Sequence, residues 1–335
     1  MSTRFGSHRF GNTAGRVVVW SSATVLAAVV LPLLFSADYD HVVMEIAAVY
    51  VIATAGLNVC IGFSGQFQMA QAALMGIAAY VTAILTLDHH WPFFAAAAVA
   101  MIVVMIFGLL VALVALRTRT HYLLLATFGL QLIAVQLIVE LDVTGGVNGH
   151  LAITEIPVIG GVLSATTPQY TVVMIVMASA ALFIADWLSR SYFGLALAAV
   201  RQSERLVLSA GLSVGKHKVA AVLISAAYAG IAGILFAPVL TYLVPDSFGL
   251  DLTLLLLLIV VVGGMGSVLG VATAAVLLSV ISQAAQSSTP AWPLIYGIVI
   301  MVVLAVAPGG LAGGVSWIRT RHSPHARKLV ASDRP

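Results

Sequence analysis

The stretch FFAAAAVAMIVVMIFGLLVALVAL, residues 93–116, contains only apolar side chains and glycine, and Arg117 follows it. About 20 apolar residues in a helix cross the ~30 Å hydrocarbon core of a bilayer, so this stretch is long enough to be a membrane span. Further segments of the same kind lie at about 17–37, 42–61, 70–87, 122–141, 169–188, 219–240, 252–267, 268–286 and 293–312. The sequence therefore predicts an all-α, polytopic integral membrane helix bundle with about ten transmembrane helices.

The overall composition excludes a soluble globular enzyme. Of the 335 residues, 61% are hydrophobic and 8% are charged, whereas soluble domains carry about 25% charged residues. The only cysteine, Cys60, lies inside an apolar stretch, so neither a disulfide nor a cysteine metal site can form within one chain. The net charge of +3 comes from bases in loops without interleaved aromatic residues, so we expect contact with membrane lipid and no nucleic acid partner.

The positions of the basic residues predict the orientation of the chain. If the amino terminus is cytoplasmic, ten spans return the carboxy terminus to the cytoplasm, and all 15 Lys and Arg residues then fall in cytoplasmic segments, as membrane proteins prefer. The segment 17–37 is longer than a signal-peptide core and lacks a following small-residue cleavage site, so we expect a retained first span. The expected organisation is a cytoplasmic N-terminal arm (1–16), a transmembrane domain (17–313) and a basic cytoplasmic tail (314–335).

Two connections are too long to be simple turns. The outer loop, 142–168, contains TGGVNGH (144–150), and the inner loop, 189–218, is the most basic internal stretch. Long loops in compact proteins usually carry function. Residues 195–210 lack Gly and Pro and separate apolar from charged side chains, so they predict one short helix along the membrane surface, ended by Gly211. The alternative is a basic anchor that binds no partner.

Three short motifs suggest enzymatic sites, and each fails on a chemical requirement. GFSGQ (62–66) places Ser64 in a glycine-rich turn, but a serine nucleophile needs a histidine base, and all nine histidines lie in loops, tails or span ends. GLSVGKH (211–217) is one residue short of a phosphate-binding loop, and GGMGSVLG (263–270) lacks the βαβ surroundings of a dinucleotide site. With no HExxH and no metal-ligand spacing, we expect no catalytic residues, no metal and no cofactor.

The polar residues inside the spans suggest transport. Ion-coupled carriers usually keep an ionisable group near mid-membrane, but Glu45, Glu140 and Asp186 lie near span ends, where snorkelling or capping accounts for them. The energy source is therefore expected to lie elsewhere. Uncharged polar residues are candidates for a substrate pathway, and helix packing is the alternative role for each. The interior contains Asn58, Ser64, Gln66, Gln68, Gln71, Gln131, Gln136, Ser225 and Tyr228, of which the first six are the proposed pathway lining.

Five longer motifs occur in order along the chain. They are GLNVCIGFSGQFQMAQAALMGIAAY (56–80), TGGVNG (144–149), SYFGLALAAVRQSERLVLSAGLSVGKHKVAAVLISAAYAGIAGIL (191–235), PDSFGLDLTLLLLLIVVVGGMGSVLG (245–270) and APGGLAG (307–313). Together they resemble the membrane permeases of the branched-chain amino acid type ABC importer family, specifically the LivM-like partner of its LivH/LivM pair. The resemblance covers nearly the whole chain from residue 40 to residue 313.

This resemblance implies a heteromeric ATP-driven importer in the bacterial cytoplasmic (inner) membrane. Residues 17–313 would form its ABC-importer transmembrane permease domain, a translocation subunit without catalysis. The implied partners are a paralogous LivH-like permease, two cytoplasmic ATP-binding subunits and an extracytoplasmic solute-binding protein. A self-sufficient secondary transporter or facilitator is the alternative.

The resemblance also assigns roles to the two long loops. The inner helix falls where the family has the coupling segment that docks in a groove of the ATPase, and Glu204 and Gly211 match the acid and the glycine of that motif. Leu206 and Val207 depart from its usual alanines. The expected ATPase-coupling residues are Arg201, Glu204, Arg205 and Gly211, and the expected docking residues for the solute-binding protein are Gly145, Gly146, Asn148 and Gly149.

The cargo expected from the resemblance is a small polar solute, namely a branched-chain or other amino acid. Family members commonly have a hydroxyl and an imidazole at the entry to the third span, where this chain has Gln66, Gln68 and Gln71. Amide side chains offer both donors and acceptors. The departure extends the expected cargo to urea or a short amide.

Overall fold

The computed structural model describes residues 38–286, except 118–119, 152, 154, 159–160, 165–166 and 241. The predicted spans 17–37 and 293–312, the arm 1–16 and the tail 314–335 lie outside the described residues. Eight of the expected apolar segments are therefore open to comparison.

All eight of these segments are helical. They are α2 (Asp38–Asn58), which continues into the π-helical turn η1 (Val59–Phe63), α3 (Gln71–Leu87), α4 (Phe93–Arg117), α5 (Thr120–Glu140), α6 (Pro168–Arg190), α9 (Val214–Phe236), α10 (Leu250–Gly263) and α11 (Val268–Gln286). Six of the helices in the described part are long and apolar enough to cross a membrane, and α3 and α11 are shorter. The helical membrane bundle is confirmed, while the count of ten spans and the orientation of the termini stay predictions.

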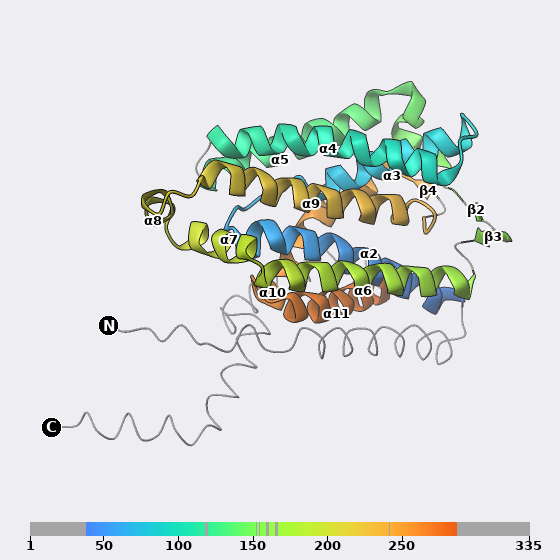
Figure 1. The fold of residues 1–335 in the computed structure, drawn as a ribbon. Helices are drawn as coiled ribbons and strands as arrows, with labels where there is room; N and C mark the ends of the chain where they lie inside the picture. The colour runs from blue at the N-terminus through green and yellow to red at the C-terminus, as the bar shows by residue number, and fades with distance from the viewer. Residues whose placement is uncertain are drawn as a thin grey trace, which may run out of the picture.

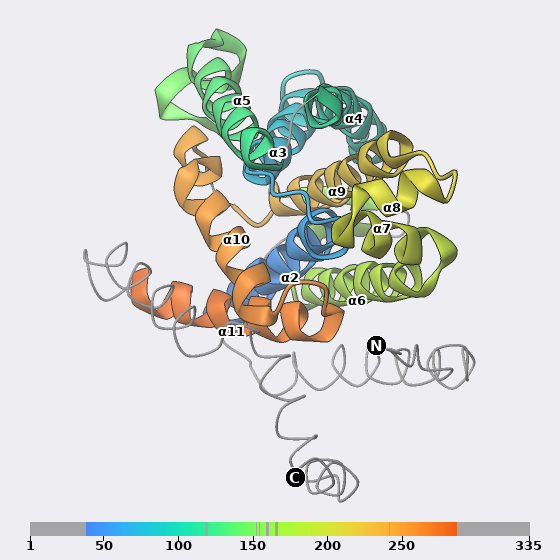
Figure 2. The same cartoon turned by 90° about the vertical axis from the view of Figure 1, so that its left-hand side faces the viewer.

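Helix α2 forms the centre of the bundle. Figure 2 shows it surrounded by α6, α9, α10 and α11, and it packs against each of them. Contact between α3 and α9 is close because Gly233 has no side chain: a Cβ there would lie 2.1 Å from the carbonyl oxygen of Met75. Small residues permit such backbone approach, which is how membrane helices gain packing without a hydrophobic driving force.

The two long loops lie at opposite ends of the bundle (Figure 1). At one end are the short helices α7 (Tyr192–Gln202) and α8 (Glu204–Ser209). At the other end the outer loop forms η2 (Asp142–Thr144), η3 (Gly146–Asn148), β1 (His150–Leu151), β2 (Glu155–Val158) and β3 (Gly161–Ser164). The connection between α9 and α10 contains β4 (Tyr242–Leu243) and η4 (Pro245–Phe248). Antiparallel pairing joins β1 to β4 and β2 to β3.

The single helix expected over 195–210 is wrong. The chain instead forms α7 and α8, separated at Ser203, whose backbone is extended (φ −163°, ψ 111°). Serine favours the N-cap position, and Glu204 then supplies an acid in the first turn of α8. The predicted stop is confirmed, because Gly211 follows α8 in the left-handed region (φ +78°) and its N–H donates to the carbonyl of Leu208 (3.0 Å).

Candidate translocation and coupling sites

The six proposed pathway residues are all buried, with at most 4% of any one exposed: Asn58, Ser64, Gln66, Gln68, Gln71 and Gln131. Several of them follow η1 on the connection between α2 and α3. In the segment after Gly65, which is neither helix nor strand, Gln66 and Gln68 are buried, whereas Phe67 and Met69 are partly exposed. A π-helical turn such as η1 is itself common beside functional sites.

Gln68, Gln71 and Ser225 form a buried cluster between the α2–α3 connection, α3 and α9. The Gln68 Nε2 donates to Ser225 Oγ (2.9 Å) and Gln71 Oε1 (3.3 Å), and Ser225 Oγ donates to Gln71 Oε1 (3.0 Å). Gln71 Nε2 also donates to the carbonyl of Ala53 on α2 (3.0 Å). The cluster therefore ties α2, α3, α9 and the α2–α3 connection together inside the bundle.

Two amide oxygens of these glutamines have no hydrogen-bond partner among the described residues. They are Gln66 Oε1 and Gln68 Oε1, and both are fully buried. The nitrogen of Gln66 is engaged, because it donates to Ser64 Oγ (2.9 Å) and to the carbonyl of Lys218 (3.3 Å). Leaving a buried acceptor unpaired costs free energy, so these oxygens are suited to accept a bond from an N–H or O–H group.

Asn58 and Gln131 have a different environment from the glutamine cluster. Asn58 Oδ1 accepts from the N–H of Gly266 (2.8 Å) in the α10–α11 turn. Gln131 Oε1 accepts from the N–H of Ala73 in the first turn of α3 (2.8 Å), and its Nε2 donates to the carbonyl of Phe248 (2.7 Å). Because the first turn of a helix leaves N–H groups unpaired, Gln131 acts as a cap from another helix. Packing accounts for these two residues.

Arg201 lies in α7 and contacts the α2–α3 connection. Its guanidinium donates to the carbonyl of Gly62. Gly65 has a positive φ (+72°), and a Cβ there would lie 2.9 Å from Arg201 Cγ. The side chain therefore joins the inner loop to the turn that precedes the glutamine cluster.

The remaining proposed coupling residues lie around α8. Glu204 Oε1 and Lys218 Nζ form an ion pair (2.7 Å), which joins α8 to the start of α9. Arg205 and Gly211 are exposed. All four proposed coupling residues are thus exposed on the inner loop, and Arg201 in addition reaches the carbonyl of Gly62.

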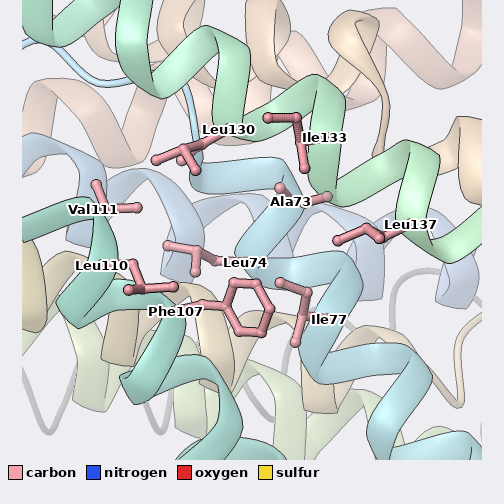
Figure 3. A pocket seen from close by; sticks show the side chains of 11 residues that line it. Ala73, Leu74, Ile77, Phe107, Leu110, Val111, Leu130, Ile133 and Leu137 are labelled. Atoms are coloured by element: carbon pink, nitrogen blue, oxygen red, sulfur yellow. The ribbon is translucent and has the colours of Figure 1, made fainter. Parts of the chain in front are cut away.

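A cavity of about 610 Å³ lies beside α7, within the usual size range of small-molecule sites. Its lining includes Phe63, Asp186, Arg190, Arg201, Gln202 and Gly266. The cavity therefore borders the η1 turn, the α6–α7 end and the α10–α11 turn at once. A second pocket, between α3, α4 and α5, is only about 40 Å³ and is lined by apolar side chains (Figure 3), so it does not suit a polar solute.

The outer loop depends on its glycines. Gly145, Gly146 and Gly149 all have positive φ (+79°, +61° and +77°). A Cβ on Gly149 would lie 2.2 Å from the carbonyl oxygen of Leu243, which belongs to β4. These turns leave Asn148 exposed, and they leave Val147, 74% exposed, at the tip.

Two polar positions differ from expectation. Glu45 does not snorkel: its side chain is fully buried, and Oε1 accepts from the Thr171 hydroxyl on α6 (2.8 Å) while Oε2 has no partner among the described residues. Thr171 also lies 3.3 Å from His41 Nδ1. Gln136, expected in the interior, is exposed on α5 and donates to Glu140 Oε1 (2.8 Å). The sequence did carry a signal for the contacts of Glu45 and His41 with Thr171: the two residues are four positions apart, which places them on one helix face.

Within the described residues there is no cluster of three or more His, Cys, Asp or Glu that would hold a metal ion. Ser64 donates to the carbonyl of Cys60 (2.6 Å) and accepts from Gln66, so its hydroxyl is used in packing. A bundle of membrane-length apolar helices around a buried amide cluster defines a multi-pass membrane protein.

The comparisons with known proteins identify the family. The family model described as the permease component of the branched-chain amino acid transport system matches residues 42–305, and the chain belongs to this family. It is 29% identical over 312 residues to the high-affinity branched-chain amino acid transport system permease protein LivM of Escherichia coli K12, covering 86% of this chain and 73% of that protein. The LivM of Salmonella typhimurium LT2 is 30% identical over 286 residues, covering 78% and 67%. No solved structure matches.

Proposed function

We propose that this chain is a translocation subunit of an ATP-driven importer that carries a small polar solute across the bacterial cytoplasmic membrane. Its partners in this proposal are a paralogous LivH-like permease, two cytoplasmic ATP-binding subunits and an extracytoplasmic solute-binding protein. The observation that carries the proposal is the contact between Arg201 of the inner loop and Gly62, next to the buried glutamines. Movement of the inner loop by the ATPase would thereby reach the interior of the bundle.

The inner loop is the proposed site of ATPase contact. Glu204, Arg205 and Gly211 are exposed on it, and the Glu204–Lys218 ion pair connects α8 to α9. Lys218 also supplies the carbonyl that accepts from Gln66 Nε2. Two states of the ATPase pair with different contacts to α7 and α8 would bias the bundle between two arrangements, because a binding partner shifts an equilibrium only by its differential affinity.

The unpaired oxygens of Gln66 and Gln68 favour a cargo with N–H donors. An amino acid has an ammonium group and urea or a short amide has N–H groups, so each can donate to these acceptors. A branched-chain amino acid is the first candidate, because the similar LivM proteins are named for branched-chain amino acid transport. The outer loop, with exposed Val147 and Asn148, is the proposed docking site for the solute-binding protein.

Reconstitution tests the main proposal. The complete complex in proteoliposomes should accumulate labelled leucine only when ATP is present on the side of the membrane that carries the ATPase subunits and the solute-binding protein is present on the other side. This chain alone should not accumulate leucine. Labelled urea and acetamide, each with its own binding protein, test the amide alternative. Accumulation by this chain alone, without ATPase subunits, would overturn the proposal.

Substitution of Glu204 tests the coupling surface. Glu204→Lys places a second ammonium group near Lys218, so uptake should fall while the transmembrane bundle stays folded. Glu204→Gln, which removes the ion pair without repulsion, is the matched control and should retain more uptake. Equal uptake by the Glu204→Lys variant and the wild type would contradict this assignment.

A self-sufficient secondary transporter is the second candidate, and one observation favours it. Glu45 is an ionisable group buried inside a span with a free oxygen, and such groups often bind a coupling ion. Uptake by the chain alone that follows an imposed proton or sodium gradient, and that Glu45→Gln abolishes, would support this candidate.

A further inference from the structure

We propose that Thr127 and Gln131 on α5 are positioning residues for the cargo site, because they hold the backbone of the segment that carries Gln68 and Gln71. Neither of the two α5 side chains contacts the cargo in this proposal. The inference rests on the proposed function, since it takes the buried amide cluster as the place where the cargo binds.

The start of α3 has no cap of its own. Helix α3 begins at Gln71, and Ala70 occupies its N-cap position without a side-chain hydrogen bond. Alanine is a poor N-cap residue, because it cannot accept from the unpaired N–H groups of the first turn. Residues 65–70, which lead into the helix, are neither helix nor strand. The backbone around Gln71 therefore depends on acceptors from elsewhere in the molecule.

Helix α5, which lies beside α3 (Figure 2), supplies two such acceptors. Thr127 Oγ1 accepts from the N–H of Met69 (3.0 Å), and Gln131 Oε1 accepts from the N–H of Ala73 (2.8 Å). These bonds lie on either side of Gln71. Thr127 and Gln131 are fully buried and four positions apart, so they share one helix face. The other buried residues of α5 are apolar: Leu123, Ala134 and Ile138.

The remaining hydrogen bonds of these two side chains fix their orientation. The Thr127 hydroxyl donates to the carbonyl of Leu123 (2.8 Å), which leaves its oxygen lone pairs free to accept from Met69. Gln131 Nε2 donates to the carbonyl of Phe248 in η4 (2.7 Å), so the amide oxygen is turned toward Ala73. A site is held precisely when the residues that support it are themselves held.

The position of this backbone matters for the cargo because Gln68 directly precedes Met69. Gln68 Oε1 is one of the unpaired acceptors to which the cargo would donate, and Gln68 Nε2 donates to Gln71 Oε1 (3.3 Å). Loss of an α5 acceptor would let both glutamines shift relative to Ser225 on α9. A misplacement of about 1 Å can cost about 10²-fold in rate. Removal of these acceptors should therefore impair transport without changing any group that binds the cargo.

Thr127→Val in the reconstituted complex tests the proposal, because it keeps the shape of the side chain and removes the acceptor for Met69. Leucine uptake per ATP hydrolysed should fall by about 10-fold or more. Thr127→Ser keeps the hydroxyl and should restore the ratio. A purely structural role would lower the amount of active complex, which reduces uptake and hydrolysis together and leaves their ratio unchanged.

Thr82→Val is the matched control. The Thr82 hydroxyl is also fully buried, but it donates only within α3, to the carbonyl of Ala78 (2.7 Å). This variant should keep the wild-type ratio of uptake to hydrolysis. A wild-type ratio in Thr127→Val, or an equal loss in Thr127→Ser and Thr127→Val, would overturn the inference.

Backbone hydrogen exchange, measured by mass spectrometry, tests the geometry without ATP or cargo. The N–H groups of residues 69–73 should exchange faster in Thr127→Val and in Gln131→Met than in the wild type and Thr82→Val, because an N–H group without its acceptor is less protected. Unchanged exchange in both α5 variants would overturn the inference even if the complex imports leucine. A wild-type complex without ATP-driven uptake would refute the proposed function instead, and the exchange result then decides separately whether α5 holds this segment.

Discussion

The guanidinium of Arg201 donates a hydrogen bond to the backbone carbonyl of Gly62, which lies 139 positions earlier in the chain. Arg201 belongs to the basic inner loop, whereas Gly62 belongs to the turn that ends the central helix α2. A cation beside a carbonyl forms a stronger bond than a neutral donor. The inner loop is therefore attached to the buried part of the protein by a side chain, in addition to the chain itself.

Arg201→Gln should break this attachment, because the shorter amide side chain carries no charge and reaches less far. We expect ATP hydrolysis by the complex to continue while uptake per ATP falls by about 5- to 150-fold. This is the fold-change that corresponds to typical coupling free energies of about 1–3 kcal/mol. Uptake and phosphate release in the same proteoliposomes measure the ratio. Arg205→Gln is the control, since Arg205 is exposed on α8; it should lower ATPase binding and leave the ratio unchanged. An unchanged ratio in Arg201→Gln would show that the attachment does not couple the two processes.

Ser225→Ala should destabilise the bundle, because it removes the hydroxyl that joins Gln68 to Gln71. Hydrogen bonds between membrane helices contribute about 1 kcal/mol, so the free energy of unfolding should fall by about that amount. Denaturant titration in detergent measures it. Ser179→Ala is the matched control, because that hydroxyl donates only within α6 to the carbonyl of Ile175. A cluster that serves transport alone would leave the stability of Ser225→Ala equal to that of the control.

The ends of α4 and α6 were predictable because bilayer thickness sets the length of a span. The apolar run 93–116 becomes α4, Phe93–Arg117, and the run 169–188 becomes α6, Pro168–Arg190. Charged or polar residues end both runs, and the helices stop there. Gly211 was also predictable, because glycine is the residue that most readily adopts the left-handed conformation after a helix.

The partners of the polar residues were not predictable from local pattern. Gln131 and Gln136 lie five positions apart on α5, which places them about 140° apart around the helix axis. One is buried and caps α3, whereas the other is exposed. Composition alone does not say which face of an apolar helix packs inward, and the same limit hid the burial of Glu45 against Thr171. The break was missed because the pattern of apolar and charged residues runs on through Ser203, whereas the backbone of Ser203 is extended and ends α7.

Gly149→Ala should distort the outer loop. The residue has φ +77°, and an added Cβ would overlap the carbonyl oxygen of Leu243. Leu243 lies in β4 and pairs with His150 in β1. A non-glycine residue in the left-handed region costs about 1–3 kcal/mol, and the overlap adds to that cost. Gly146→Ala is the control, because its Cβ would come no closer than 3.5 Å to the carbonyl of Val139. Stimulation of ATPase activity by the solute-binding protein should fall more in Gly149→Ala; equal stimulation in the two variants would separate this loop from docking.

Glu45→Gln should leave ATP-driven uptake within about twofold of the wild type, because in an importer the ATPase supplies the energy that an ion-binding carboxylate supplies in a secondary transporter. The glutamine keeps an oxygen that accepts from the Thr171 hydroxyl, and it removes a group that bears charge when ionised from a fully buried position. Stability should therefore not fall. Thr171→Val is the informative companion, since it removes the donor of Glu45 Oε1 and should lower the free energy of unfolding by about 1–3 kcal/mol. Uptake measured with and without a protonophore decides the matter: if Glu45→Gln assembles normally yet loses an uptake that is protonophore-sensitive in the wild type, the carboxylate carries the coupling ion and the importer account of Glu45 is wrong.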